Sequence, residues 1–180
     1  ASYEGFARRG LSAESTNALL QRSVDIAQSA RRRVLRDQPG TERALLVAAS
    51  VGPYGAMLHD GSEYRGDYGL DEDALVDFHR ERFAALADAG ADLLACETIP
   101  SRIEAAALVR LLGERSDAKA WVTFSCRDGR HTSAGDSIAE CARWLDGVPQ
   151  VVAIGVNCVA PDLVESLIHE LGTGTTKPIV

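Results

Sequence analysis

The feature that most constrains this sequence is a regular alternation of short apolar runs with amphipathic segments. The apolar runs occupy residues 44–49, 92–96, 120–124 and 151–156. They are too short and too continuously apolar for surface helices, and they are typical of buried strands. The segments between them carry apolar residues at steps of three and four, which is the spacing of one helix face. Strict alternation of strands and helices predicts a parallel sheet covered by helices.

Capping residues mark where the helices are expected to begin. We expect helices over residues 12–36, 71–89, 101–113, from 137 onward and 161–172, with a long loop over residues 50–70. Ser101 with Glu104, and Ser137 with Glu140, each have the spacing of a capping box at a helix start. The last four residues, 177–180, predict the beginning of one more strand.

Two parallel architectures fit this order of elements, an open doubly wound sheet and a closed barrel. A nucleotide-binding open sheet would carry a glycine-rich turn leading directly into a helix, whereas residues 50–55 lead into a loop. This difference favours the α/β fold of a (β/α)8 TIM barrel. Such a barrel needs about 250 residues. The sequence opens at Ala1 rather than Met and stops at Val180 just as a strand is expected to begin. We therefore expect an incomplete barrel, an internal piece of a longer protein.

Charge and cysteine spacing limit the possible partners and location. The formal net charge is −7, and no basic stretch is long enough to follow a phosphate backbone, so we expect no nucleic-acid partner. The three arginines at 31–33 lie on the polar side of a predicted helix, where we expect them to be solvated. No apolar run has membrane-spanning length, and the four cysteines contain no C-x-x-C pair. We expect a cytoplasmic protein that is not bound to a membrane.

Polar and sulfur-bearing residues follow the predicted strands, where parallel α/β folds place their chemistry. Glu97 could cap a helix, or it could pair with an ammonium group or act as a base. Asn157 could be a turn residue, or it could orient a substrate. A lone cysteine is commonly a small core residue, but Cys158 stands at a strand end where a metal ligand or nucleophile would lie.

The other cysteines and the histidines are weaker candidates for chemistry. Cys96 precedes Glu97 by one residue, so strand alternation predicts that the thiol faces the helices. Cys141 lies on the apolar stripe of a predicted helix, and Cys126 begins a loop. His79 shares a helix face with apolar residues, which favours a hydrogen-bonded core histidine. No Ser-His-Asp or Cys-His arrangement is visible.

Four segments together resemble the homocysteine S-methyltransferases. They are Ser-Val-Gly-Pro-Tyr-Gly at 50–55, Gly-Ser-Glu-Tyr-Arg-Gly-Asp-Tyr at 61–68, Asp-Leu-Leu-Ala-Cys-Glu-Thr at 92–98 and Gly-Val-Asn-Cys at 155–158. Their order and spacing match that family, and the resemblance covers essentially the whole chain. The Gly-Ser-Glu-Tyr segment resembles the branch that uses S-methylmethionine or S-adenosylmethionine as methyl donor.

The resemblance implies a zinc-dependent methyltransferase whose small-molecule substrates are homocysteine and a sulfonium methyl donor. It implies a (β/α)8 barrel with zinc at its mouth, and Cys158 as the catalytic metal ligand, the first of three cysteines. The residues that it implies for substrate binding are Glu97, Asn157, Ser50, Gly52, Tyr54 and Thr123. Glu97 would recognise the homocysteine ammonium, Asn157 would lie beside the metal, and the turn from Ser50 to Tyr54 would line the cavity. Donor contacts would come from the loop around Tyr64.

Two parts of the family pattern are absent from this sequence. The first strand with its Asp-Gly-rich turn would precede Ala1, and the Gly-Gly-Cys-Cys segment that supplies two zinc ligands would follow Val180. Counted against the family, the chain holds about strands 3 to 7 of one homocysteine-binding barrel domain over residues 1–180. We expect the isolated chain to be inactive, and the resemblance leaves its oligomeric state open.

Two rival functions remain at the level of sequence. One is a truncated, catalytically inactive barrel that acts as a binding or regulatory protein. The other is a barrel lyase or aldolase, which would need a lysine after a strand to form a Schiff base. Lys119 and Lys177 both precede predicted strands, so neither stands at the required end.

Overall fold

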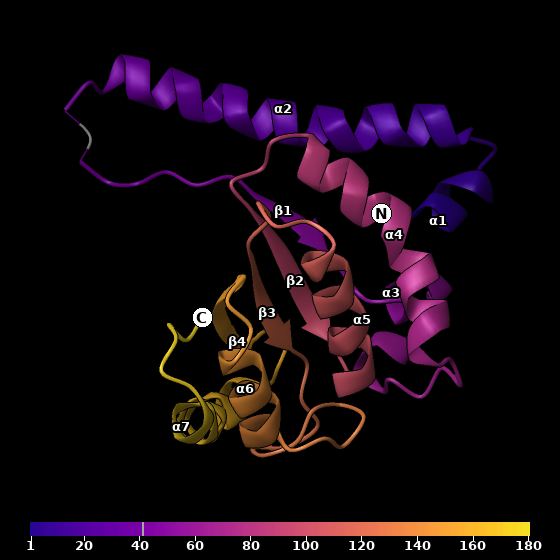
Figure 1. Ribbon diagram of the computed structural model, residues 1–180, viewed down its shortest axis with the longest axis vertical. Helices are drawn as coiled ribbons and strands as arrows, with labels where there is room; N and C mark the ends of the chain where they lie inside the picture. The colour runs from indigo at the N-terminus through magenta and orange to yellow at the C-terminus, as the bar shows by residue number, and fades with distance from the viewer. Residues whose placement is uncertain (41) are drawn as a thin grey trace.

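A computed structural model describes residues 1–40 and 42–180 of the chain. Its centre is a four-stranded parallel sheet in the order β1-β2-β3-β4, shown in Figure 1. The strands are β1 (Ala48–Val51), β2 (Leu93–Ile99), β3 (Ala120–Phe124) and β4 (Val151–Val156). Each strand lies beside the preceding one, as in a barrel, and the described sheet contains no reversal of the doubly wound kind. The expectation of an incomplete (β/α)8 barrel is confirmed.

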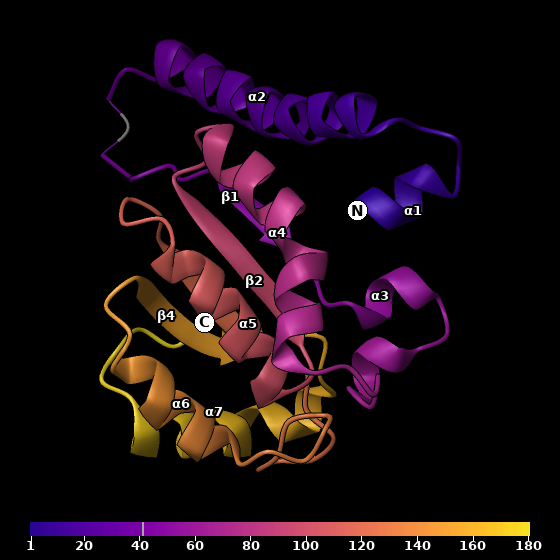
Figure 2. The ribbon, with the colours of Figure 1, turned by 45° about the vertical axis from the view of Figure 1, so that its right-hand side comes forward.

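Helices follow the strands in alternation, as the sequence predicts. They are α1 (Tyr3–Ala7), α2 (Ala13–Asp37), α3 (Gly55–Leu58), α4 (Glu72–Asp88), α5 (Arg102–Gly113), α6 (Ile138–Asp146) and α7 (Val164–Gly174), with 3₁₀ turns η1 (Ser62–Tyr64) and η2 (Pro161–Leu163). Figure 2 shows α4 and α5 beside β2, while α6 and α7 lie below β4 in this view. Among the described residues, none of the helices combines the length and hydrophobicity that a bilayer-spanning segment needs.

The expected first strand, 44–49, is wrong at both ends. Pairing with β2 begins only at Ala48, opposite Leu93, and it continues through Val51. Leu46 precedes the paired region and is 64% exposed. The apolar run alone therefore does not determine where β1 begins, because the first pair also depends on where β2 begins.

Four other expectations differ from the structure. The segment expected as a loop over residues 50–70 contains α3 and η1, and the second strand extends past Cys96 to Ile99. Arg31 is not simply solvated, because its guanidinium forms an ion pair with the Asp92 carboxylate and donates to the Leu45 carbonyl. Ile179 makes one parallel bridge with Ile154, so the strand expected at 177–180 is present as a single bridge.

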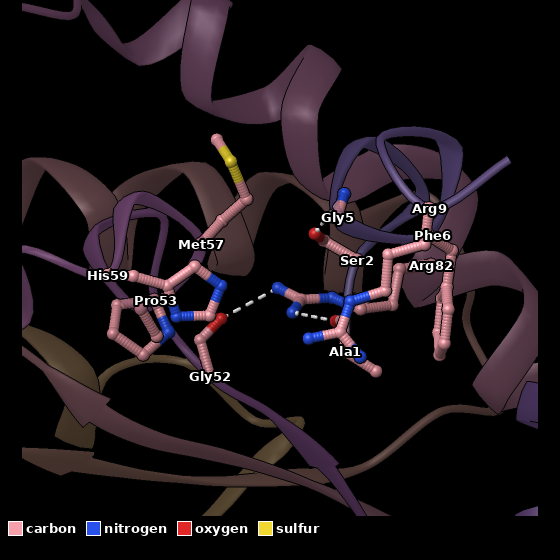
Figure 3. Close-up of a pocket in the computed structure, with 11 residues that line it drawn as sticks. Ala1, Ser2, Gly5, Phe6, Arg9, Gly52, Pro53, Met57, His59 and Arg82 are labelled. Atoms are coloured by element: carbon pink, nitrogen blue, oxygen red, sulfur yellow. Dashed lines mark hydrogen bonds between the residues drawn. The ribbon is translucent and has the colours of Figure 1, made fainter.

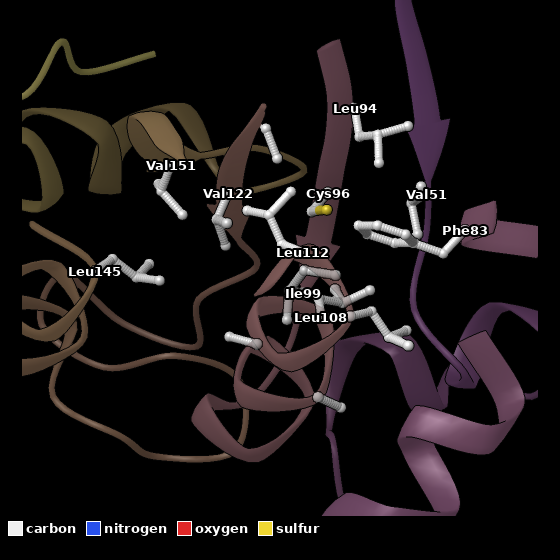
Figure 4. Close-up of a cluster of buried hydrophobic side chains, with 14 of the residues drawn as sticks. Val51, Phe83, Leu94, Cys96, Ile99, Leu108, Leu112, Val122, Leu145 and Val151 are labelled. Atoms are coloured by element: carbon white, nitrogen blue, oxygen red, sulfur yellow. The ribbon is translucent and has the colours of Figure 1, made fainter. Parts of the chain in front are cut away.

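The hydrophobic core lies between the sheet and the helices that cover it. Phe83 of α4 and Leu108 and Leu112 of α5 are each at most 2% exposed, and Figure 4 shows them gathered around Cys96 of β2. Burial raises the pKa of the Cys96 thiol to about 12. The prediction that Cys96 faces the helices is confirmed, and its neighbour Glu97 therefore points to the opposite face of the sheet.

Gly55 provides a test of how tightly the 50–70 segment is packed. A Cβ atom at Gly55 would lie 2.3 Å from the Glu63 backbone nitrogen, so α3 and η1 would have to separate. We expect Gly55→Ala to lower the free energy of unfolding by about 1–3 kcal/mol, measured by urea denaturation of the chain. Gly113→Ala is the matched control, because that position at the end of α5 is exposed and open, and alanine favours helices there. Equal stability of the two variants would contradict this packing.

Candidate functional site

The side chains at the carboxyl ends of the strands form a cluster of two hydrogen-bonded groups, which meet where Glu97 is followed by Thr98. In the parallel register, Ser50 faces Ala95 of β2, and Glu97 lies two residues further along the same face. The Ser50 hydroxyl donates to Glu97 Oε1 at 2.5 Å. A charge-assisted bond of this kind fixes one carboxylate oxygen and leaves the other free to receive a cation.

Asn157 is the residue that connects the other strand ends. Its Oδ1 accepts hydrogen bonds from the Thr98 backbone N–H at 2.7 Å and from the Thr123 hydroxyl at 2.8 Å. Its Nδ2 donates to Thr98 Oγ1 at 2.8 Å and to the Cys158 sulfur at 3.4 Å. Because a backbone N–H can only donate, Oδ1 must face Thr98, which fixes the orientation of the amide. Asn157 therefore ties β2, β3 and the end of β4 together.

Cys158 is the exposed member of this cluster. Its thiol is free, and its sulfur accepts from Asn157 Nδ2 and from the Thr98 hydroxyl at 3.5 Å. The sulfur also lies beside the Tyr64 phenol, and its negative charge when ionised is the main cause that raises the pKa of that phenol. The loop around Tyr64 thus reaches the same sulfur as the ends of β2 and β4.

The backbone at this cluster is strained in two places. Thr98 has φ of 62° and Cys158 has φ of 53°, both in the left-handed region. For a β-branched residue such as Thr98 this conformation costs on the order of 1–3 kcal/mol, and it persists only where surrounding contacts hold it. The bonds from Thr98 to Asn157 supply such contacts. Strain of this kind is concentrated at functional sites.

Two of the predicted site residues, Gly52 and Tyr54, lie outside this cluster. Gly52 lines a cavity of about 220 Å³ together with Pro53, Met57 and His59, shown in Figure 3, and the cavity contains none of the strand-end side chains. The Tyr54 ring packs against Tyr68, with centroids 5.1 Å apart. The structure therefore brings Ser50, Glu97, Thr123, Asn157 and Cys158 together through neighbouring strand ends, but not Gly52 and Tyr54.

Within the described residues, no group of three or more His, Cys, Asp or Glu side chains could hold a metal ion. Cys141 is buried on its helix, and burial raises the pKa values of both Cys126 and Cys141 to about 12. A catalytic zinc site needs three protein ligands, with the fourth position left for water or substrate. Cys158 thus fits one position of a metal site, and the residues described here do not complete it.

Asn157 is predicted to stabilise the fold as well as the site. Asn157→Ala would leave the Thr98 N–H without its acceptor and remove the contacts that hold the strained backbone. We expect a loss of about 1–3 kcal/mol in the free energy of unfolding, measured by urea denaturation. Asn17→Ala on α2, which removes the acceptor of the Tyr3 hydroxyl, should change stability by only about 0.5 kcal/mol. If the Asn157 variant were as stable as the control, the strain would not be held by this amide.

Comparison with known proteins agrees with this geometry. The family described as homocysteine S-methyltransferase matches residues 1–180. The chain is 49% identical to homocysteine S-methyltransferase YbgG of Bacillus subtilis, covering 99% of the chain and 58% of that protein. It is 48% identical to homocysteine S-methyltransferase of Escherichia coli, covering 100% of the chain and 59% of that protein.

Solved structures give the same result. The metallated form of the Escherichia coli homocysteine methyltransferase MmuM superposes with a TM-score of 0.96 at 47% identity, over 100% of this chain and 62% of that one. The class defined by the parallel strands and the helices between them is that of (β/α)8 barrels. The chain belongs to the homocysteine S-methyltransferase family, and it spans about three-fifths of the length of these relatives.

Proposed function

We propose that the complete protein containing this chain transfers a methyl group from a sulfonium donor to homocysteine and forms methionine. The observation that carries the proposal is the strand-end cluster, in which the Glu97 carboxylate and the exposed Cys158 thiol lie on the same edge of one sheet. Membership in the family, whose curated relatives are named homocysteine S-methyltransferases, supports the same reaction. Residues 1–180 would form part of a single barrel domain.

The substrate would lie between β2 and β4. These strands are separated by β3, which places their backbones roughly 10 Å apart. Glu97 would pair with the homocysteine ammonium through the oxygen that Ser50 does not bind. Asn157 and Thr123 would line the site between the ends of β2 and β4. The homocysteine thiol would then point toward Cys158. The protein's main contribution is this positioning of the reacting sulfur.

We further propose zinc as the metal, with Cys158 as one ligand and the others from residues outside this chain. The Escherichia coli homocysteine methyltransferase, whose structure is described as a metallated form, supports a metal in this family. When bound, zinc would lower the pKa of a coordinated thiol, which is about 8.5 when free. The described part of this chain offers too few ligands by itself, so we expect the chain to be inactive alone.

The reaction balances without a general base at carbon. A lone pair of the homocysteine sulfur forms the new S–CH₃ bond, and the bond from that methyl carbon to the sulfonium sulfur breaks with its electron pair. The donor leaves as a neutral thioether, and the thiol proton goes to solvent.

Tyr64, beside the Cys158 sulfur, supports an S-methylmethionine or S-adenosylmethionine site at this edge. We propose small-molecule partners only, in the cytoplasm.

Product stoichiometry tests this function. Incubating the metal-loaded complete protein with homocysteine and S-methylmethionine should yield two methionines for each donor consumed, measured by mass spectrometry. With S-adenosylmethionine it should yield one methionine and one S-adenosylhomocysteine. Consumption of neither donor would refute the proposal, and it would favour the alternative of an inactive barrel that only binds homocysteine.

A further inference from the structure

Three polar side chains are buried together between α4 and α5, behind the turn at 52–54. His79 and Glu104 are fully buried, and Arg82 is only 4% exposed. Charged groups at this depth are costly unless each is paired and hydrogen-bonded. The strand-end cluster does not use any of the three, so their burial needs another explanation.

The contacts within this trio determine where its protons lie. Arg82 can only donate, and its NH2 group lies 2.7 Å from His79 Nδ1, so Nδ1 must be the unprotonated acceptor. His79 Nε2 lies 2.9 Å from Glu104 Oε1, which an Nε2–H group can satisfy by donating. His79 is therefore neutral and links the guanidinium to the carboxylate. Burial, the largest influence on His79, lowers its pKa and agrees with this state.

The two ends of the trio hold the two ends of the turn. Arg82 Nη2 donates to the Gly52 carbonyl at 2.6 Å, and Glu104 Oε1 accepts from the Tyr54 N–H at 2.6 Å. Glu104 has the sequence position of a capping-box residue, but its carboxylate is used here for the turn. Ser101 still caps α5 through its own hydroxyl.

Aromatic packing holds the same turn from its outer side. The Tyr54 ring lies edge-on to Phe78 with centroids 4.8 Å apart, and the Arg82 guanidinium lies 5.5 Å from the Phe78 ring centroid. The turn directly follows β1, whose Ser50 hydroxyl donates to Glu97. The position of the turn therefore sets where β1 ends, and with it the position of the group that orients Glu97.

We propose that His79, Arg82 and Glu104 are positioning residues that clamp the turn at 52–54 and hold Ser50 in register with Glu97. The consequence for catalysis rests on the proposed function, whereas the clamp itself does not. A site held from behind by buried charge-assisted bonds is preorganised, and displacement of such a support by about 1 Å can cost a reaction about a hundredfold.

Hydrogen exchange at the Tyr54 amide tests the clamp in the 180-residue chain. Glu104→Ala should speed exchange of this amide at least about fivefold, while core amides such as Val122 stay unchanged. Glu104→Gln keeps an oxygen that can accept from both Tyr54 and His79, so it should restore most of the protection. Glu114→Ala is the matched control, because the Glu114 carboxylate also joins the end of α5 to a side chain of α4, in this case Arg80, but at the surface.

Two outcomes would overturn the clamp. One is a Tyr54 exchange rate that is the same in a folded Glu104→Ala variant as in the unsubstituted chain. The other applies even if that variant does not fold: ¹⁵N NMR of His79 in the unsubstituted chain should show Nδ1 unprotonated and Nε2 protonated near neutral pH. The opposite tautomer, or a doubly protonated ring, contradicts the proposed chain of donors.

The effect on catalysis is a separate readout in the complete protein. Glu104→Ala should raise KM for homocysteine about tenfold and change KM for the methyl donor much less, because the turn directly follows Ser50, whose hydroxyl binds Glu97. Glu104→Gln should recover most of the loss. If the unsubstituted protein transfers no methyl group, the proposed function fails while the exchange and tautomer results still decide the clamp. Equal changes in both KM values would limit the trio to a general role in stability.

Discussion

Replacing Cys158 with alanine in the complete protein is expected to abolish methyl transfer and most metal binding. Cys158 is exposed, its thiol is free, and two donors direct its sulfur toward the open edge of the sheet. Loss of an outer-shell partner costs a metal site about 10- to 100-fold, so loss of a ligand should exceed that range. Metal content by mass spectrometry and the rate of methionine formation measure the two effects.

Cys126→Ala is the matched control for this substitution. Cys126 also follows a strand on the same sheet, but its sulfur is partly buried and burial raises its pKa to about 12. We expect this variant to keep its metal and at least about half of its activity, because substitutions away from ligands and hydrogen-bonded networks have small effects on a protein. Full metal occupancy in Cys158→Ala would show that Cys158 is not a metal ligand.

The second large effect is expected at Glu97. Glu97→Gln keeps the shape of the side chain and an acceptor for the Ser50 hydroxyl, but it removes the charge that would pair with the homocysteine ammonium. Truncating one partner of a desolvated charge pair costs about 2–5 kcal/mol, so kcat/KM for homocysteine should fall by at least about thirtyfold. Steady-state kinetics with homocysteine as the varied substrate measures this loss.

Two further variants separate recognition by charge from positioning. Ser50→Ala keeps the Glu97 carboxylate and removes only its orienting hydrogen bond, so a smaller loss of about tenfold or less is expected. Glu114→Gln, a surface carboxylate after α5, should leave the kinetics unchanged. If Glu97→Gln had no larger effect than Glu114→Gln, Glu97 would not bind the substrate.

The sequence predicted the order of elements because that order depends on local periodicity. The runs at 120–124 and 151–156 became β3 and β4 with the same bounds, and the cap residues Ser101 and Ser137 begin α5 and α6 as expected. The start of β1 was predicted wrongly, because it depends on where β2 begins 45 residues later. The short helix α3 was missed because its packing against η1, not its periodicity, holds it.

The candidate site was predictable in its members but not in its connections. Glu97, Asn157 and Cys158 follow apolar strands, which is a local signal. The hydrogen bonds between Thr98 and Asn157 join residues 59 positions apart, and the backbone of Thr98 is left-handed. No local sequence pattern predicts either feature. The clamp of His79, Arg82 and Glu104 could not be predicted for the same reason. The sequence does predict that His79 is a hydrogen-bonded core histidine, and the structure confirms this. Its partner Glu104 has the spacing of a helix-capping residue, and this spacing does not reveal that the carboxylate binds Tyr54 and His79.

The proposed function requires that homocysteine is bound at the carboxyl ends of the strands with its thiol ionised. Calorimetry of homocysteine binding to the metal-loaded complete protein, repeated near pH 7 in buffers of different ionisation enthalpy, counts the protons released. A free thiol has a pKa of about 8.5 and is mostly protonated at that pH, so about one proton should be released per homocysteine bound. Binding of homocysteine with no proton release, by protein that keeps its metal, would contradict the account.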